Sequence, residues 1–385
     1  MRFEMKKILI TTALLSSITF GFSANKEYNF LVLTDIHLDI DKDTPMVIDP
    51  AKYSSENELD KPTFDKMLEL VSSGIGKDIP KPNSIFMLGD MVRHGKAVDL
   101  WDNSKEVVYK NQSYIYNTFD KVFEGIPVLY TFGNNDNITH YGNYTDDGFS
   151  PYKVAKTNGL DGQISHTDYC FDTAPRPCML AESQLDGHYA SMLDEHLEVI
   201  DINSVYLSRK YNTDKQKSQA ELDFLQKELM KAKKAGNSVL VATHIPVGND
   251  SYDNKNLWSE EYTQQFIQII KEYKDTVIGI VNGHTHTEEL RILAIDDDTN
   301  IGEYTTPSLT TTVTNAPGFK SFTLAENDNK WSIKDYTAYT FIGDDTKNLQ
   351  IKELYTFSTE YCKGDYNENI NTCLANVTLQ NIDKF

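Results

Sequence analysis

The chain has 385 residues, of which 39% are hydrophobic and 11% aromatic, enough for a sizeable core, so a disordered protein is excluded. Its formal net charge of −20 at pH 7 argues against stable binding of nucleic acids or anionic membranes, because both depend on clustered Lys and Arg side chains. Length and composition together favour one main domain with an extension.

The N-terminal segment differs from the rest of the chain. Three basic residues precede a short apolar stretch at residues 8–22, and Ser23 and Ala24 are small residues suited to cleavage. This pattern predicts a signal peptide over residues 1–24, with an uncleaved anchor as the alternative. No later segment reaches the roughly 18 consecutive apolar residues that a membrane helix needs. We therefore expect a secreted or periplasmic protein without a transmembrane segment.

Five apolar runs follow, and each ends in polar residues of types that bind metal ions. Continuous apolar runs bounded by turn residues are typical of strands that are buried on both faces of a sheet. In chain order the runs cover residues 28–37, 84–90, 127–134, 238–244 and 276–286.

Helical patterns separate these runs. In one of them, Leu222, Leu225 and Leu229 recur at helical spacing before Gly236, which is expected to end the helix. Alternating strands and helices predict an α/β architecture, in which ligands gather at the carboxyl ends of the strands along one sheet edge. The predicted helices cover residues 61–71, 113–123, 219–234 and 260–273.

After residue 286 the sequence becomes rich in alternating Thr and Ser, a pattern that predicts antiparallel strands. A helix is predicted at residues 349–359, within a C-terminal extension over residues 346–385 that follows a main domain over residues 25–345. The predicted strands of this part cover residues 290–295, 308–314, 321–324 and 331–341.

The four cysteines fall into two local pairs, Cys170 with Cys178 and Cys362 with Cys373. Four cysteines allow three connectivities, and two local disulfides are the simplest of them for an exported protein. Their spacing does not match a thiolate zinc site. We therefore expect structural disulfides.

The polar ends of the five runs supply seven possible metal ligands. Imidazole and carboxylate donors without thiolates suit zinc, manganese or iron, and seven donors exceed the needs of one ion. Two divalent transition-metal ions that share a bridging carboxylate would use them all, and could attract a phosphorylated substrate to an acidic protein. The candidates are Asp35, His37, Asp90, Asn134, His244, His284 and His286.

This series of motifs resembles the calcineurin-like metallophosphoesterase superfamily, over about residues 28–345. Within that superfamily, Gly89-Asp90-Met-Val-Arg-His94 is similar to the G-D-x-x-x-H form of the acid sphingomyelinase-like phosphodiesterases. The motifs that carry the resemblance are Asp35-x-His37, Gly89-Asp90, Gly133-Asn134, His244 and Gly283-His284-Thr-His286.

The resemblance implies a two-sheet αββα sandwich and a centre of two metal ions bridged by Asp90. Zinc is the expected metal, with manganese and iron as alternatives. The implied ligands are Asp35, His37, Asp90 and His286 for one ion, and Asp90, Asn134, His244 and His284 for the other.

The sequence departs from the superfamily at Asn135, where most members place a histidine that assists the transition state or the leaving group. His94 remains as the candidate general acid, and Asn135 and Asp136 are candidate substrate contacts. The Gly-Asn-Asn-Asp form resembles the endopolyphosphatase branch. A phosphoanhydride, which leaves as a stabilised phosphate, needs less proton donation than an alkoxide does.

These patterns predict an exported two-metal phosphoesterase that hydrolyses phosphodiester or phosphoanhydride bonds in a small or polymeric substrate. Two alternatives stay open: an endopolyphosphatase-type hydrolase, and a metal-loaded pseudoenzyme that binds phosphorylated ligands without turnover. The missing histidine at Asn135 is the reason for both.

Overall fold

The structure is a computed structural model that describes residues 26–49, 57–96, 102–143, 154, 169–171, 173–183, 186–211, 214–296, 299–312, 315–362 and 366–377. The predicted signal peptide at residues 1–24 lies outside these ranges. None of the helices in these ranges combines the length and apolar character that a membrane span requires.

Two large sheets dominate the described part of the chain, with a short parallel pair, β2 (Leu38–Asp39) and β3 (Leu59–Asp60), beside them. The six-stranded sheet has the order β15 (Gln350–Thr356), β14 (Lys330–Ile342), β13 (Gly318–Asn327), β1 (Glu27–Leu33), β4 (Ser84–Leu88) and β5 (Val128–Thr131). The seven-stranded sheet has the order β11 (Glu289–Ala294), β12 (Asn300–Thr305), β10 (Val277–Asn282), β9 (Ser238–Ala242), β8 (Leu197–Asp201), β7 (Tyr189–Asp194) and β6 (Cys178–Glu182).

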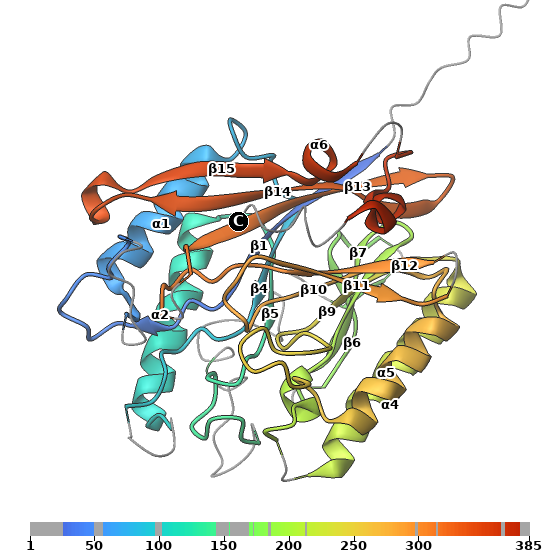
Figure 1. The fold of residues 1–385 in the computed structure, drawn as a ribbon, viewed down its shortest axis with the longest axis horizontal. Coiled ribbons are helices and arrows are strands. Elements are labelled where there is room, and N and C mark those ends of the chain that lie inside the picture. Colours follow the sequence, from blue (N-terminus) through green and yellow to red (C-terminus); the bar gives the residue numbers. More distant parts are fainter. Residues whose placement is uncertain are drawn as a thin grey trace, which may run out of the picture.

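Helices cover the outer faces of both sheets, as Figure 1 shows. Helices α1 (Lys61–Gly74) and α2 (Lys105–Val122) pack on the six-stranded sheet, and α4 (Lys215–Ala235) and α5 (Glu260–Glu272) pack on the seven-stranded sheet. A separate apolar cluster fills the space between the sheets. The mixed α/β fold and the αββα sandwich expected from the resemblance are therefore confirmed.

Strand β1 shows why these runs are apolar throughout. Leu31 and Leu33 pack with α1 and α2, whereas Phe30 and Val32 point into the cluster between the sheets. Successive side chains of a strand point to opposite faces, so a strand covered on both faces needs apolar residues at every position. The five predicted runs are buried strands for this reason.

Short sequence signals set the helix ends. The Asp60 side chain accepts a hydrogen bond from the Thr63 N–H at the start of α1, and Ser104 does the same for Val107 at the start of α2. Helix α2 thus begins earlier than predicted, at this cap. Gly236 ends α4 with a left-handed φ of 80°, which confirms the predicted stop.

The structure corrects three predictions. The five predicted strands do not share one sheet, because β1, β4 and β5 belong to the six-stranded sheet and β9 and β10 to the other. The predicted strand at residues 308–314 is wrong, because its described part, residues 308–312, is a buried loop. The predicted helix at residues 349–359 is also wrong. That segment forms the edge strand β15, which pairs with β14, and leads into the short helix α6 (Phe357–Tyr361).

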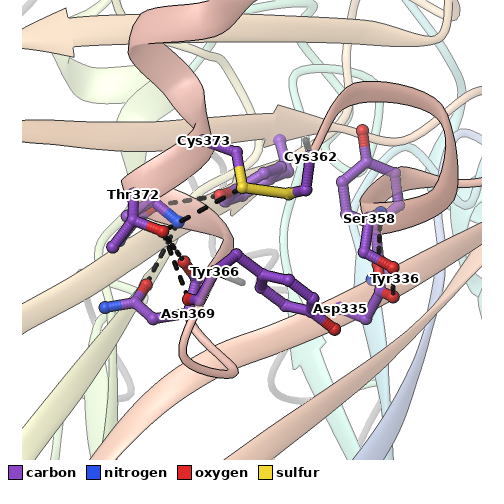
Figure 2. The surroundings of a disulfide bond; sticks show 10 residues. Asp335, Tyr336, Ser358, Cys362, Tyr366, Asn369, Thr372 and Cys373 are labelled. Atoms are coloured by element: carbon purple, nitrogen blue, oxygen red, sulfur yellow. Dashed lines mark hydrogen bonds between the residues drawn. A yellow bond between two sulfur atoms is a disulfide. The ribbon is translucent and has the colours of Figure 1, made fainter. Parts of the chain in front are cut away.

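Three 3₁₀ helices complete the described elements: η3 (Ser204–Leu207), η4 (Thr346–Asn348) and η5 (Ile370–Asn376). The structure contains both local disulfides, Cys170–Cys178 and Cys362–Cys373. Figure 2 shows that the second one ties η5 to the end of α6. Beside it, the Asp335 carboxylate accepts a hydrogen bond from the Ser358 N–H at 3.0 Å. This disulfide therefore fixes the last described helix against the cluster between the sheets.

We predict that Cys373→Ser destabilises the protein but leaves its metal content unchanged, because the disulfide closes a local loop away from the polar strand ends. The expected loss of unfolding free energy is about 2–3 kcal/mol. Urea denaturation of the variant and of the parent protein measures this loss, with Cys170→Ser as the matched control at the other disulfide. Intact-mass spectrometry that found free thiols in the parent protein would contradict the pairing.

Candidate metal centre

The seven candidate ligands all follow the carboxyl ends of strands. Strands β1, β4 and β5 are parallel to one another, and so are β9 and β10, so each group ends at one edge of its sheet. The two edges meet where the Asp35 carboxylate, after β1, accepts a hydrogen bond from the His284 N–H, after β10, at 2.8 Å. Both sheets therefore contribute side chains to one buried cluster.

The backbone at this cluster is unusual. Five of the seven candidates have positive φ angles, between 45° and 73°, in the left-handed region that residues with side chains rarely adopt. Such conformations cost of order 1–3 kcal/mol each and concentrate at functional sites. The five residues are Asp35, His37, Asp90, His284 and His286.

Two glycines allow the loops to approach this closely. Gly89 has a φ of 95°, and a Cβ atom there would meet the His244 ring. A Cβ atom at Gly133 would overlap the Asp90 carboxylate. Glycine is therefore required at positions 89 and 133 on steric grounds, because the loops pack closely around Asp90.

The first group of donors surrounds the Asp35 carboxylate. Asp35 Oδ1 lies 3.4 Å from His286 Nε2 and 3.7 Å from His37 Nε2, and the two histidine nitrogens are 3.0 Å apart. His37 Nε2 also lies 3.5 Å from Asp90 Oδ2. Four potential ligand atoms thus converge on one small volume.

The second group lies on the other side of Asp90. Asp90 Oδ2 is 3.4 Å from His244 Nε2, which is 3.1 Å from Asn134 Oδ1. His244 Nδ1 donates to the Leu88 carbonyl at 2.7 Å, which directs Nε2 toward the cluster. The ring of His284 packs edge-on against His244, with centroids 5.1 Å apart. Asp90 is therefore the residue shared by both groups.

The donor spacing fits metal binding. Ligands about 2.1 Å from a tetrahedral ion lie roughly 3.4 Å from one another, close to the separations in both groups. Three nitrogen or oxygen atoms of the candidate ligands are also buried without a hydrogen-bond partner among the described residues, namely Asp35 Oδ1, His37 Nδ1 and His284 Nδ1. Buried polar atoms usually have partners, so the unpartnered Asp35 Oδ1 and His284 Nδ1 suit a cation. The seven residues could hold two divalent ions that share Asp90.

The electrostatics of the cluster also suit cations. Burial on its own would raise the pKa of Asp90, but its contacts with His244 and His37 hold that pKa well below its ordinary value. Burial likewise opposes ionisation of Asp35, whereas His286 and His37 hold its pKa low. Both carboxylates are therefore ionised, and they supply the negative charge that a dication needs.

Asn135 and Asp136 both bind the turn that carries Asp90. Asn135 donates from its backbone N–H to Asp90 Oδ1 and from Nδ2 to Asp90 Oδ2, at 2.8 and 2.7 Å. Asp136 is fully buried, and its carboxylate accepts hydrogen bonds from the N–H groups of Asp90, Met91, Val92 and Gly133. Both side chains thus hold the Asp90 turn. This corrects the expectation for Asp136, because backbone N–H groups occupy both of its carboxylate oxygens, whereas Asn135 as a substrate contact stays a prediction.

His94 lies beside the first group of donors. Its ring stacks on that of His37, with centroids 4.1 Å apart and planes 6° from parallel. Glu58, which the sequence analysis missed, holds His94: its Oε1 lies 2.7 Å from Nδ1 and accepts the His94 N–H at 3.1 Å. Burial would lower the pKa of His94, but the Glu58 carboxylate raises it above its ordinary value. Glu58 follows no apolar run, so only the three-dimensional contact identifies it.

Known proteins with similar sequences agree with this geometry. A family profile described as calcineurin-like phosphoesterase matches residues 28–288. "Sphingomyelin phosphodiesterase 2" of Caenorhabditis elegans is 25% identical over 327 residues, which cover 81% of this chain and 49% of that protein. "Sphingomyelinase phosphodiesterase D" of Dictyostelium discoideum is 26% identical over 294 residues, covering 73% and 61% of the two chains.

An "Endopolyphosphatase" of Neurospora crassa is also similar, with 22% identity over 233 residues, which cover 57% of this chain and 30% of that protein. The chain spans 49% and 61% of the lengths of the first two relatives. The similarity is therefore to one part of each longer relative, and the family match over residues 28–288 includes all the strand ends described above.

We predict that Asp90→Ala lowers metal occupancy at both positions, because Asp90 lies between both groups of donors. Elemental analysis of protein purified without chelator should find close to two ions per chain in the parent protein and at most one in the variant. Glu221→Gln is the control, since Glu221 is a fully buried carboxylate on α4 that contacts His188 and the Asn203 N–H instead of the cluster. Full occupancy in Asp90→Ala would rule out a shared ligand.

Proposed function

Because the chain belongs to the calcineurin-like phosphoesterase family, a family of metal-dependent hydrolases, we propose that it is an exported two-metal phosphoesterase that hydrolyses a phosphodiester or phosphoanhydride bond. One observation carries this proposal: seven donor side chains from two sheets converge around Asp90, at the separations that two ions would require. Its relatives include proteins named for phosphodiester and for polyphosphate substrates.

In the proposed site, Asp35, His37, Asp90 and His286 hold one ion, and Asp90, Asn134, His244 and His284 hold the other. Two such ions would polarise the phosphoryl oxygens and lower the pKa of water. Zinc is the expected metal because the donors are imidazole and carboxylate groups. Asn135 keeps the Asp90 carboxylate in place through two hydrogen bonds.

His94 is the proposed general acid. Glu58 lies at Nδ1, so the proton that His94 transfers to the leaving oxygen is on Nε2. The Glu58 carboxylate raises the pKa of His94, so His94 retains this proton to a higher pH than a free imidazole does. Glu58 acts through His94 and is therefore a positioning residue.

Export is supported by the two disulfides, which persist in oxidising compartments, and by the signal-like residues 1–24. The intact mass of the exported protein would show directly whether residues 1–24 have been removed.

The function is tested by turnover of bis(p-nitrophenyl) phosphate, since a nitrophenyl diester needs only the metals and not the acid. We expect metal-replete protein to hydrolyse it, a chelator to abolish the activity, and added Zn²⁺ or Mn²⁺ to restore it. Initial rates on sphingomyelin, nucleotides and polyphosphate then rank the natural substrate classes. Protein that carries two ions but turns over none of these compounds would instead be the metal-loaded, ligand-binding pseudoenzyme.

We predict that His94→Ala reduces kcat on an alkyl phosphodiester far more than on a nitrophenyl diester. General acid catalysis contributes about 10²–10⁴-fold where the leaving group needs a proton, as an alkoxide does and a nitrophenolate does not. Glu58→Gln should show the same selectivity with a smaller loss, because the imidazole remains. The metal content of both variants should equal that of the parent protein. Equal losses on the two esters would show that His94 supports the metal ligands instead.

A further inference from the structure

A second wall of the site lies on the His284 side and contains Tyr141, His140 and Lys210. The Tyr141 hydroxyl is 3.4 Å from His284 Nε2, and the ring of Tyr141 packs edge-on against that of His284. The Lys210 ammonium donates to the same hydroxyl at 3.3 Å and lies 4.8 Å from the centre of the Tyr141 ring. The Tyr141 hydroxyl thus connects Lys210 to His284, a proposed metal ligand.

This wall is built rigidly. Tyr141 is nearly buried, has a left-handed φ of 56°, and donates its backbone N–H to the Asn134 carbonyl at 3.1 Å. His140 packs against Tyr141 and accepts a hydrogen bond from Asn134 Nδ2 at 2.9 Å, which turns Asn134 Oδ1 toward His244. The Tyr141 hydroxyl is therefore fixed relative to the second group of donors.

Lys210 has no carboxylate partner among the residues that the structure describes. The adjacent Arg209, in contrast, pairs with Asp253 at 2.8 Å and lies 3.9 Å from Asp250. Lys210 as a residue is exposed to solvent, although the Tyr141 ring shields one side of its ammonium. Burial of its nitrogen and the nearby Arg209 lower the pKa of Lys210, and a bound anion would reverse that direction.

An unpaired ammonium at this position is informative because the chain carries a formal net charge of −20. Long-range attraction of an anionic substrate is weak in such a protein, so a local cation has to supply it. A lysine ammonium is a compact charge with three donors that suits a phosphate oxygen. A lipid or nucleoside group without charge would gain less from it, because only one partner of the hydrogen bond would then be charged.

We propose that Lys210 and the Tyr141 hydroxyl bind a second phosphate group, bonded through an oxygen bridge to the phosphate under attack, so that the preferred substrate class is the phosphoanhydrides. This inference rests on the proposed function and specifies its substrate. His94 stacks on His37, whereas Lys210 and Tyr141 lie beside His284, so the two walls flank Asp90. In this arrangement Lys210 binds the phosphate that stays bonded to the attacked phosphorus, and the leaving phosphate departs on the His94 side.

The reaction balances without any other reactant. Water adds its oxygen to the attacked phosphorus, and the bond from this phosphorus to the oxygen that bridges to the leaving phosphate breaks. The leaving phosphate keeps that bridging oxygen and its electron pair, and the bridge to the phosphate bound by Lys210 stays intact. The proton released from water is taken up by that phosphate or by the buffer. No redox partner is needed.

The test compares tripolyphosphate with bis(p-nitrophenyl) phosphate as substrates for the metal-replete full chain. We expect Lys210→Met to raise the KM for tripolyphosphate about 10- to 100-fold, because the variant loses one hydrogen bond between charged groups. The kcat/KM for the nitrophenyl diester, which has no second phosphate, should fall far less. Lys210→Arg keeps the charge and should retain most of the affinity, and Tyr141→Phe should show a smaller loss than Lys210→Met. Lys66→Met is the matched control, since Lys66 is a partly exposed lysine on α1 that pairs with Glu69.

The outcomes separate this inference from the proposed function. Equal effects of Lys210→Met on both substrates, or no effect on either, would overturn the phosphate-binding role. A parent protein that hydrolyses the nitrophenyl diester but not tripolyphosphate would also overturn it and leave the proposed function intact. A parent protein with no activity on either substrate would instead refute the proposed function itself. An unchanged content of two metal ions and an unchanged thermal unfolding midpoint show that the variants are folded.

Discussion

The placement of the Asp90 carboxylate is the constraint on which the rest of the structure depends. Asp90 leaves β4 with a left-handed φ of 52°, and its two oxygens accept hydrogen bonds from Asn135. The Asp136 carboxylate holds the same turn by accepting hydrogen bonds from the backbone N–H groups of Asp90, Met91 and Gly133. The carboxylate is thereby fixed between His37 and His244, which come from different sheets. The sandwich brings these two sheet edges together, and the left-handed turns direct the side chains inward.

Much of the candidate site could be predicted because its signal is local. Each donor follows an apolar run directly, so the sequence identifies both the buried strand and the residue at its end. All seven predicted donors do lie in one cluster. Their division between two sheets could not be derived from the runs alone, since an apolar run does not specify its pairing partner, and here the resemblance supplied the missing information.

The unpredicted features depend on contacts between distant parts of the chain. Glu58 lies in a loop before α1 and becomes informative only through its contact with His94. Lys210 likewise gains meaning only beside Tyr141. Asp136 has a suggestive position in the sequence, but backbone N–H groups fix its direction away from the site. Strand β15 lies at a sheet edge with four of its seven residues exposed, so it lacks the apolar pattern that marks the central strands. Its type is determined by pairing with β14.

The two flanks of the cluster differ in chemistry, and this difference accounts for how an acidic protein could act on an anionic substrate. One flank carries a histidine whose proton is supported by Glu58, and the other carries an ammonium without a carboxylate partner in the described chain. Between them, ionised Asp35 and Asp90 require cations before any phosphate can approach, because bare carboxylates would repel it. Metal binding is therefore the first requirement of the whole account.

Anomalous X-ray scattering from crystals grown with Zn²⁺ or Mn²⁺ tests that requirement most directly. The account predicts two anomalous peaks, one on each side of the Asp90 carboxylate. One peak should lie among Asp35, His37 and His286, and the other among Asn134, His244 and His284. A single peak, or peaks away from Asp90, would contradict the account.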